Sequence, residues 1–319
     1  MRPLAPQHVV AIDVGGTSLK GSVVDGDGHA VSLERRPTRA EDGPDAVIDA
    51  VLALASDLTS GSPDTAAVGL ALPGVVDDET GTVISAANLR WRHVPIAALA
   101  AERLGLAVAV MHDVRAAAVA EGLLGAARGA HDYLLMTLGT GVGAAMVIRG
   151  QPYTGAHGFG GELGHVAVEP RGPLCGCGRA GCLEAFASAG HIALRYRAMA
   201  GAHAEGCSAR EVAQRAATGE PIAGAVWREA VDALAIAVAN YVTLMDPELI
   251  VIGGGMAAAG DELFGSLRHR LEAHMRFGKP PPVVPAWLGE EAGRYGAAIG
   301  AWRAAGIDEA RLRTWQTRP

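Results

Sequence analysis

One histidine and three of the four cysteines of this chain lie within eighteen residues of one another. Thiolate and imidazole form a tetrahedral ligand set for zinc, and the glycines between the cysteines allow a short loop to bring three sulfurs around one ion. Reduced thiols in a flexible loop are the less favoured interpretation, because cysteines rarely cluster this tightly without a ligand to hold. The sequence therefore predicts a zinc site made by His165, Cys175, Cys177 and Cys182.

Two acids, Glu162 and Glu184, flank this cluster. A zinc-bound imidazole is oriented by the partner of its second nitrogen, so His165 can hold the metal with one nitrogen and meet a ligand hydroxyl with the other. Carboxylates that accept hydrogen bonds from several hydroxyls indicate a polyol or sugar as the ligand. Solvated glutamates beside a metal loop are an equally frequent alternative. The remaining cysteine, Cys207, stands alone and is predicted to be inert.

His112 and Asp113 follow an apolar run at 106–111 and precede an alanine-rich helical stretch at 114–122. Asp113 is therefore either a helix N-cap, which is the more common use of aspartate at such a junction, or a catalytic base. A carboxylate here can accept a hydroxyl proton as phosphoryl transfer begins. One residue can do both.

Three glycine-rich turns follow apolar strands, and none matches a P-loop or a dinucleotide-binding fingerprint in its strand-to-helix context. Glycine amides can still cradle phosphate oxygens, threonine hydroxyls add donors, and an aspartate at a strand end can hold Mg²⁺ through water. Glycine also serves hairpins and tight packing, so a single turn is weak support. The residues predicted to bind nucleotide phosphates and Mg²⁺ are Asp13, Gly15, Gly16, Thr17, Lys20, Gly139, Thr140, Gly141, Gly254 and Gly255, with Lys20 as a charge partner or simply a surface residue.

The hydrophobic pattern predicts two α/β halves, the first in the order βββαβ. Both halves pair strands through glycine turns, and two such lobes facing one cleft would place a nucleotide between them. We expect strands at 9–14, 19–25, 30–34, 66–72, 133–138, 143–148 and 249–252, and helices at 45–58, 227–245 and 293–305, the last folding back onto the first lobe.

Composition excludes several classes of function. The net charge is −7 and the basic residues form no run, which argues against a nucleic-acid surface. No apolar stretch is long enough to span a membrane, and residues 1–8 lack the apolar segment of a signal peptide. We therefore expect a cytoplasmic protein with two substantial cores and no membrane or nucleic-acid partner.

Taken together, these motifs resemble the ROK family (repressor, open reading frame, kinase), in particular its sugar kinases of the bacterial glucokinase type. The resemblance runs from about Val9 to Gly300, and its most specific segment runs from Glu162 through His165 and the three cysteines to Glu184. It implies an α/β, two-lobed actin-like ATPase (ribonuclease-H-like) fold, in which each lobe is a mixed sheet flanked by helices. The expected lobes are residues 1–112, with a C-terminal helix at about 293–319 packing back on them, and residues 113–292, which carry the zinc loop and the adenosine-binding segment.

The resemblance also implies roles for individual residues. Asp113 would be the base that takes the proton from the sugar 6-hydroxyl, and the glycine turns would bind the phosphates and adenosine of ATP. The residues implied to contact the sugar are Gly74, Asn88, His112, Asp113, Glu162, His165 and Glu184. His112 stands where the family's kinases usually have asparagine, which leaves the sugar and the pH profile open.

The leading hypothesis is ATP-dependent phosphorylation of a hexose, most simply glucose, with Mg²⁺ at the phosphates and Zn²⁺ organising the sugar loop. Kinases for N-acetylmannosamine, N-acetylglucosamine, mannose or fructose are the alternatives within the class, and polyphosphate is an alternative donor. Some members of the family are DNA-binding repressors, but only eight residues precede Val9 here, which leaves no room for a DNA-binding arm. A non-catalytic, sugar-sensing regulator that acts on other proteins is the less favoured function. The family resemblance further implies a homodimer or a dimer of dimers.

Overall fold

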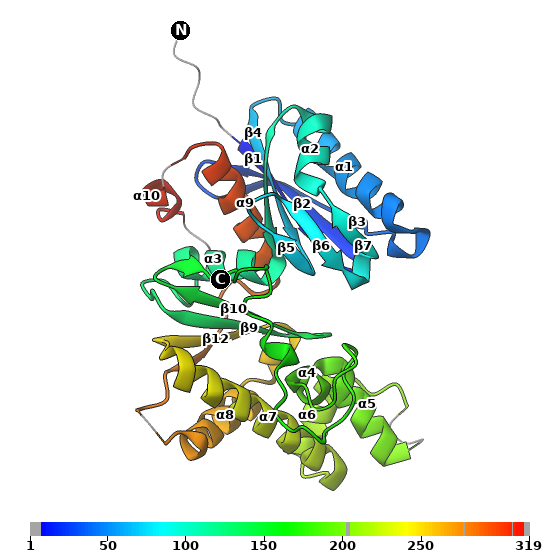
Figure 1. Ribbon diagram of the computed structural model, residues 1–319, viewed down its shortest axis with the longest axis vertical. Coiled ribbons are helices and arrows are strands. Elements are labelled where there is room, and N and C mark those ends of the chain that lie inside the picture. Colours follow the sequence, from blue (N-terminus) through cyan, green and yellow to red (C-terminus); the bar gives the residue numbers. More distant parts are fainter. Residues whose placement is uncertain (1–7, 202–204, 277, 308, 316–319) are drawn as a thin grey trace. The chain divides into compact units, whose positions relative to one another are not determined.

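The computed structural model describes residues 8–201, 205–276, 278–307 and 309–315 (Figure 1). The chain divides into two compact units, the first made by residues 1–129, 152–160 and 290–319 and the second by residues 130–151 and 161–289. The first unit extends past the boundary expected at residue 112, because helix α3 (Asp113–Leu124) packs against helix α9 (Ala292–Ala304). Residues 1–7, for which the sequence predicts no signal peptide, and residues 316–319 of the expected C-terminal helix lie outside the described residues.

A mixed five-stranded sheet forms the centre of the first unit, with strand order β3-β2-β1-β4-β8. β1 pairs antiparallel with β2 and parallel with β4, and β4 pairs parallel with β8. The carboxyl ends of β1, β4 and β8 therefore meet at one edge of the sheet. The strands are β1 (His8–Val14), β2 (Ser18–Asp25), β3 (Ala30–Pro37), β4 (Thr65–Leu72) and β8 (Ala107–His112).

The two faces of this sheet carry side chains of different size. One face presents valine, leucine and isoleucine, such as Val10, Ile12 and Leu70, to α1 (Pro44–Ser60), which supplies Val51 and Leu54 to the same core. The other face consists largely of alanine and glycine and lies against α9. Glycine is required there, because a Cβ on Gly69 of β4 would lie 1.9 Å from the carbonyl oxygen of Ala297.

The first unit also contains several shorter elements. A small antiparallel sheet follows β4 and leads to α2, and the last short helix comes after α9. These elements are β5 (Val75–Asp77), β6 (Thr82–Ala86), β7 (Trp91–Val94), α2 (Ile96–Leu104), α10 (Glu309–Leu312) and the 3-10 turns η1 (Ala40–Asp42), η2 (Ala87–Leu89) and η6 (Gly289–Glu291).

The second unit repeats the design of sheet and helices. Its sheet has the order β11-β10-β9-β12-β13, with β9 antiparallel to β10 and parallel to β12. The strands are β9 (Tyr133–Leu138), β10 (Val142–Ile148), β11 (Gln151–Pro152), β12 (Leu249–Gly253) and β13 (Val283–Pro285). The helices are α4 (Leu183–Ala187), α5 (Ala189–Ala200), α6 (Ala209–Ala217), α7 (Pro221–Met245) and α8 (Asp261–His274), with 3-10 turns η3 (Leu163–His165) and η5 (Gly255–Ala259).

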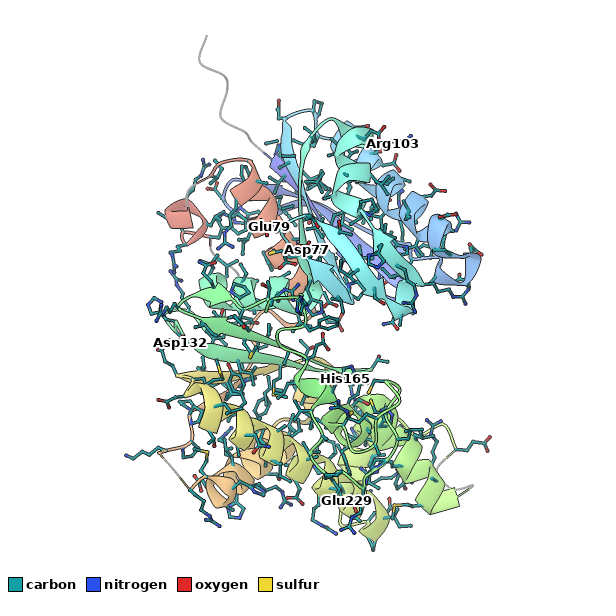
Figure 2. All side chains as sticks on the ribbon, viewed as in Figure 1. Asp77, Glu79, Arg103, Asp132, His165 and Glu229 are labelled. Carbon is teal, nitrogen blue, oxygen red and sulfur yellow. The ribbon has the colours of Figure 1, made fainter. Side chains whose placement is uncertain are left out.

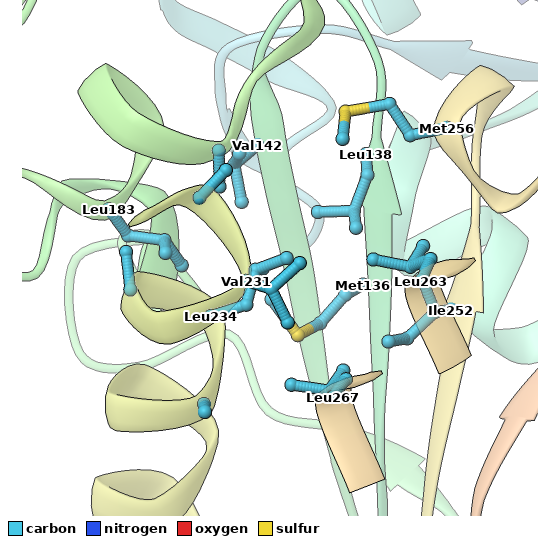
Figure 3. Close-up of a cluster of buried hydrophobic side chains, with 14 of the residues drawn as sticks. Met136, Leu138, Val142, Leu183, Val231, Leu234, Ile252, Met256, Leu263 and Leu267 are labelled. Carbon is cyan, nitrogen blue, oxygen red and sulfur yellow. The ribbon is translucent and has the colours of Figure 1, made fainter. Parts of the chain in front are cut away.

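The core of the second unit lies between this sheet and helices α7 and α8. Met136 and Ile252 on neighbouring strands meet Leu234 of α7 and Leu267 of α8 in one buried cluster (Figure 3). Leu183, the first residue of α4, belongs to the same cluster. The short helix that carries Glu184 is therefore anchored in the core of the unit.

The predicted strands and helices are confirmed in type, and most differ only at their ends. The long helix begins at Pro221 rather than at residue 227, because proline suits the first turn of a helix. The sequence reading did not predict the small β5–β6–β7 sheet or helices α2, α5, α6 and α8. No helix among the described residues is long and apolar enough to cross a membrane. The cytoplasmic location stays a prediction.

We expect Gly296→Ala to destabilise the first unit, because the added Cβ would lie 2.0 Å from the carbonyl oxygen of Ala116 in α3. Forcing α9 away from α3 should lower the free energy of unfolding by about 1–3 kcal/mol, measured from urea midpoints. Gly61→Ala is the control, since Gly61 has a φ of −72° and its new Cβ would meet nothing closer than 3.4 Å. Equal stability of the two variants would contradict this packing argument.

Candidate active site

Two carboxylates of the first unit lie at the edge where its parallel strands end. Asp13 is the penultimate residue of β1, and Asp113 follows β8 as the first residue of α3. The negative charge of Asp113 raises the pKa of Asp13, so the two groups interact electrostatically. Asp13 also faces α9, where a Cβ on Gly293 would lie 3.1 Å from its carboxylate. The fold thus brings together two acids that are one hundred residues apart in the sequence.

Burial gives both acids an unusual affinity for protons. Desolvation, and then the charge of Asp113, raises the pKa of Asp13 to about 6, while the charge of Lys20 opposes the rise. Desolvation likewise raises the pKa of Asp113 to about 6, against the hydrogen bond from the backbone N–H of Val114 and the charge of Arg115. A carboxylate with a pKa just below neutrality is mostly ionised at pH 7 and still basic enough to take a proton from a hydroxyl.

The structure also separates the two roles that the sequence left open for Asp113. Asp113 lies inside α3, and the N-cap position belongs to His112, with no capping hydrogen bond from a side chain. Its Oδ1 accepts a 2.7 Å hydrogen bond from the N–H of the next residue, Val114, and lies 3.2 Å from Nε2 of His112. The interpretation of Asp113 as an N-cap is therefore wrong, because an N-cap residue lies before the helix and bonds to its second or third N–H.

Hydrogen bonds hold the first glycine turn in a fixed shape, beside a residue that is predicted to contact the sugar. Its Gly15 N–H donates to the carbonyl of Ser18 at 2.9 Å, and the Thr38 hydroxyl donates to the Gly15 carbonyl at 2.6 Å. Asn88 is exposed on η2 and lies against Gly16. A Cβ added to Gly16 would be 3.4 Å from the Cβ of Asn88. Thr17 is exposed at the tip of the turn.

Two further residues of the first unit that are predicted to belong to the site, Gly74 and Lys20, have evident structural roles. Gly74 has a φ of +98°, and a Cβ there would lie 2.3 Å from the carbonyl oxygen of Ser85, so only glycine fits. Lys20 extends to Glu290, with its Nζ 3.3 Å from the backbone carbonyl and 3.4 Å from the carboxylate. Because Lys20 also pairs with Asp13 across β1 and β2, it is a charged neighbour of that acid.

The predicted zinc ligands of the second unit converge on one point. The candidate ligand atoms of His165, Cys175, Cys177 and Cys182 all lie within 4.8 Å of one another. The Sγ atoms of Cys177 and Cys182 are 3.6 Å apart, and Nδ1 of His165 is 3.8 Å from Sγ of Cys175. A tetrahedral zinc with bonds of about 2.3 Å to sulfur requires sulfur separations of about 3.8 Å, so these residues fit the ion.

The loop leaves the other side of His165 facing an acid. Its Nε2 lies 3.9 Å from Oε2 of Glu162, and both side chains are about two-fifths exposed. Figure 2 shows His165 on the turn that begins this loop. The imidazole can therefore bind a metal through Nδ1 and present Nε2, together with Glu162, to a polar ligand.

Glu184, at the other end of the loop, connects the four predicted zinc ligands to a glycine turn. Its Oε2 accepts a 2.9 Å hydrogen bond from the N–H of Val142, and its Oε1 lies 3.7 Å from Sγ of Cys175. A Cβ on Gly141 would lie 2.7 Å from Oε2 of Glu184, which explains the glycine there. The carboxylate thus links the metal loop to the turn at 139–141.

A pocket of about 660 Å³ lies within the second unit and includes this turn. Gly139, Thr140 and Gly255 line it, whereas a Cβ on Gly254 would lie 2.5 Å from the Leu138 carbonyl, so Gly254 serves the close packing of its own turn. Most residues that line this pocket were not predicted from the sequence, among them Ser208, Arg210, Gln214, Trp227 and Glu262. The only sequence signal for this wall is Ser208 with Glu211, which form a capping box at the start of α6.

The fold has two α/β units that each carry part of the candidate site, and comparison with known proteins identifies the family. The family model described as "ROK family" matches residues 9–303. A glucokinase of Thermotoga maritima is 37% identical over 91% of this chain and 96% of its own length. An N-acetylmannosamine kinase of Citrobacter koseri is 34% identical over 82% and 88% of the two chains.

A solved structure supports the same conclusion. The ROK family glucokinase from Streptomyces griseus, crystallised with glucose and AMPPNP, superposes with a TM-score of 0.79, is 32% identical, and covers 93% of this chain and 99% of its own. The chain therefore belongs to the ROK family, and the predicted resemblance and actin-like fold class are confirmed.

The raised pKa of Asp13 has a consequence for stability. A carboxyl group whose pKa is higher in the folded protein costs stability once the pH exceeds its unfolded value, and the cost is full above the folded value. For a rise from 3.8 to about 6, Asp13→Asn should increase the free energy of unfolding at pH 8 by up to about 2–3 kcal/mol. The gain should shrink as the pH is lowered through 6 towards 5, in urea unfolding curves at each pH.

Asp77→Asn should change the free energy of unfolding in the opposite direction. Hydrogen bonds from the side chain and backbone of Thr80 lower the pKa of Asp77, so this variant should lose stability at pH 8. An Asp13→Asn variant that is less stable than the parent at pH 8 would show that ionised Asp13 is stabilising.

Proposed function

We propose that this protein transfers the γ-phosphoryl group of ATP to the 6-hydroxyl of a hexose, with glucose as the expected acceptor. The observation that carries the proposal is the pair of half-buried carboxylates with raised pKa values, Asp13 and Asp113, in a chain that is 37% identical to a glucokinase over most of its length. Phosphoryl transfer needs one group to accept the hydroxyl proton and others to neutralise and position the phosphates. The two units offer candidates for each task.

Asp113 is the proposed general base. Its pKa near 6 keeps it ionised at pH 7, and one of its oxygens is already held by Val114 and His112. The other oxygen, Oδ2, takes neither of these contacts and is the proposed proton acceptor. A fixed base with a matched pKa contributes about 10²–10⁴-fold to the rate of such a reaction.

Asp13 and the two glycine turns are the proposed phosphate side of the site. Carboxylate oxygens suit Mg²⁺, which Asp13 would hold through water, and the ion would neutralise charge on the phosphates when bound. The amides and hydroxyls at Gly15–Thr17 in the first unit and at Gly139–Gly141 in the second are proposed phosphate donors. The 660 Å³ pocket beside Thr140 and Gly255 is the proposed adenosine site.

Each unit also supplies proposed sugar contacts. In the first unit these are Asn88, His112 and the backbone at Gly74. In the second unit they are Glu162, His165 and Glu184, whose loop a zinc ion would hold in one conformation, as structural zinc does in other proteins. We also propose a homodimer, or a dimer of dimers.

N-acetylmannosamine is the principal alternative acceptor, because a kinase for that sugar is 34% identical over 263 residues. N-acetylglucosamine, mannose and fructose remain alternatives on the same chemistry, and His112, in place of the usual asparagine, bears on this choice. A sugar-sensing regulator without catalysis is the alternative of a different class.

A coupled assay of ADP release with a panel of hexoses tests the proposal. We expect glucose to give the highest kcat/KM and the acetamido sugars to give values at least about tenfold lower. Asp113→Asn should bind glucose normally and turn over at least about a hundredfold more slowly, while Asp45→Asn, on the exposed start of α1, should behave like the parent. Sugar binding without phosphoryl transfer from ATP or polyphosphate would favour the regulator instead.

Metal analysis tests the zinc proposal. We expect about one zinc per chain, and Cys177→Ser should release it and raise KM for the sugar at least about tenfold, with KM for ATP nearly unchanged. Cys207→Ser is the matched control, because Cys207 is buried outside the four-residue cluster. Full sugar affinity in a zinc-free Cys177→Ser protein would remove the metal from the sugar site.

A further inference from the structure

An ion pair between a buried arginine and a partly exposed aspartate adjoins the proposed base. Arg115, the second residue after Asp113 in α3, is 2% exposed and forms a two-pronged contact with Asp78, with Nε to Oδ2 at 3.0 Å and Nη2 to Oδ1 at 2.9 Å. Asp78 lies on the turn after β5, between Asp77 and Glu79, which Figure 2 labels. Neither Asp78 nor Arg115 was singled out in the sequence.

The ion pair is part of a larger set of hydrogen bonds that holds the backbone of His112 on one side of Asp113 and the side chain of Arg115 on the other. Oδ1 of Asp78 also accepts from the N–H of His112 at 3.3 Å, and Arg115 donates to the carbonyls of Val76 at 2.9 Å and Gly158 at 3.3 Å. The residue before the base and the second residue after it are therefore both bound to one carboxylate. We name this arrangement the Asp78–Arg115 clasp.

Stability alone is a poor reason for such a clasp. Burying an arginine and a carboxylate costs desolvation energy that their attraction often only balances, and apolar residues of similar size serve a core as well. What a planar, two-pronged pair supplies is geometry, because it allows a single relative orientation. The orientation that it determines here is that of the β8–α3 junction.

We propose that Asp78 and Arg115 are positioning residues that hold the β8–α3 junction so that Oδ2 of Asp113 faces the acceptor hydroxyl. This inference rests on the proposed function of Asp113 as the base. His112 completes the arrangement, since the clasp fixes its backbone and its imidazole contacts Oδ1 of Asp113.

The clasp also contributes charge. Arg115 lowers the pKa of Asp113 against the effect of burial. The other charged or titratable groups around the two acids are His112 on β8, Asp13 on β1, Lys20 on β2, and Glu291 and Arg294 at the start of α9. Arg115 can be exchanged for lysine with its charge kept and its two-pronged contact with Asp78 lost.

Steady-state kinetics with glucose and ATP on the intact protein tests the positioning role. We expect kcat to fall about a hundredfold in Asp78→Asn and at least about tenfold in Arg115→Lys, with KM for ATP within about twofold of the parent, because small displacements of a reacting group are costly. Asp232→Asn is the matched control, since it breaks the Asp232–Arg270 pair in the second unit, and its kcat should stay within about twofold. A parent-like kcat in folded Arg115→Lys and Asp78→Asn would overturn the proposal.

The pKa of Asp113 in the free protein gives a readout that needs no turnover. The ¹³C carboxyl signal of Asp113 is assigned by its loss in Asp113→Asn and titrated in the parent, Arg115→Lys and Arg115→Met. We expect the midpoint to rise by at least about half a pH unit in Arg115→Met and to stay near the parent value in Arg115→Lys. An unchanged midpoint in Arg115→Met would also count against the clasp.

The two experiments distinguish the inference from the function on which it rests. An inactive parent protein that shows the expected ¹³C shifts would overturn the proposed function and leave the clasp as the structural support of Asp113. An active parent whose clasp variants match Asp232→Asn would overturn the clasp and keep the function.

Discussion

The close approach of α9 to the sheet of the first unit is the constraint on which its site depends. Alanine and glycine on one face of the sheet let the helix backbone come within van der Waals distance of β4, and Gly296 lets the same helix touch α3. Because α9 contacts β1, β4, β8 and α3 at once, it fixes the strand ends that carry Asp13 and Asp113. The opposite face uses larger aliphatic residues and serves stability.

The same packing shifts the pKa values of two acids, because it partly shields Asp13 and Asp113 from water. Desolvation, rather than any single charged neighbour, is the largest cause of the raised pKa of Asp13 and of Asp113. The protein thereby holds two groups in a state that costs folding energy, which is common where a residue is tuned for reaction. Backbone N–H groups, Lys20 and Arg115 limit that cost without abolishing it.

In the second unit, one short segment connects three candidate binding features. The candidate metal-ligand cluster, the exposed edge of His165 with Glu162, and the turn at Gly139–Gly141 all meet at the loop that ends in Glu184. Leu183 anchors this loop in the apolar core beside Val142 and Leu234. A metal that holds the loop would therefore also steady the turn that we propose for phosphate binding.

The sequence by itself determined the features that depend on neighbours along the chain. The candidate metal ligands, the glycine turns and the strand-and-helix pattern could be predicted because thiolate spacing, backbone freedom and hydrophobic period are local properties. Only the tertiary structure decided that Asp13 and Asp113 share one sheet edge, that Asp78 reaches Arg115, and that α6 lines the pocket. Those relations join residues that are distant in sequence, and a single chain carries no local signal for burial, for which helix covers which face, or for the pKa that results.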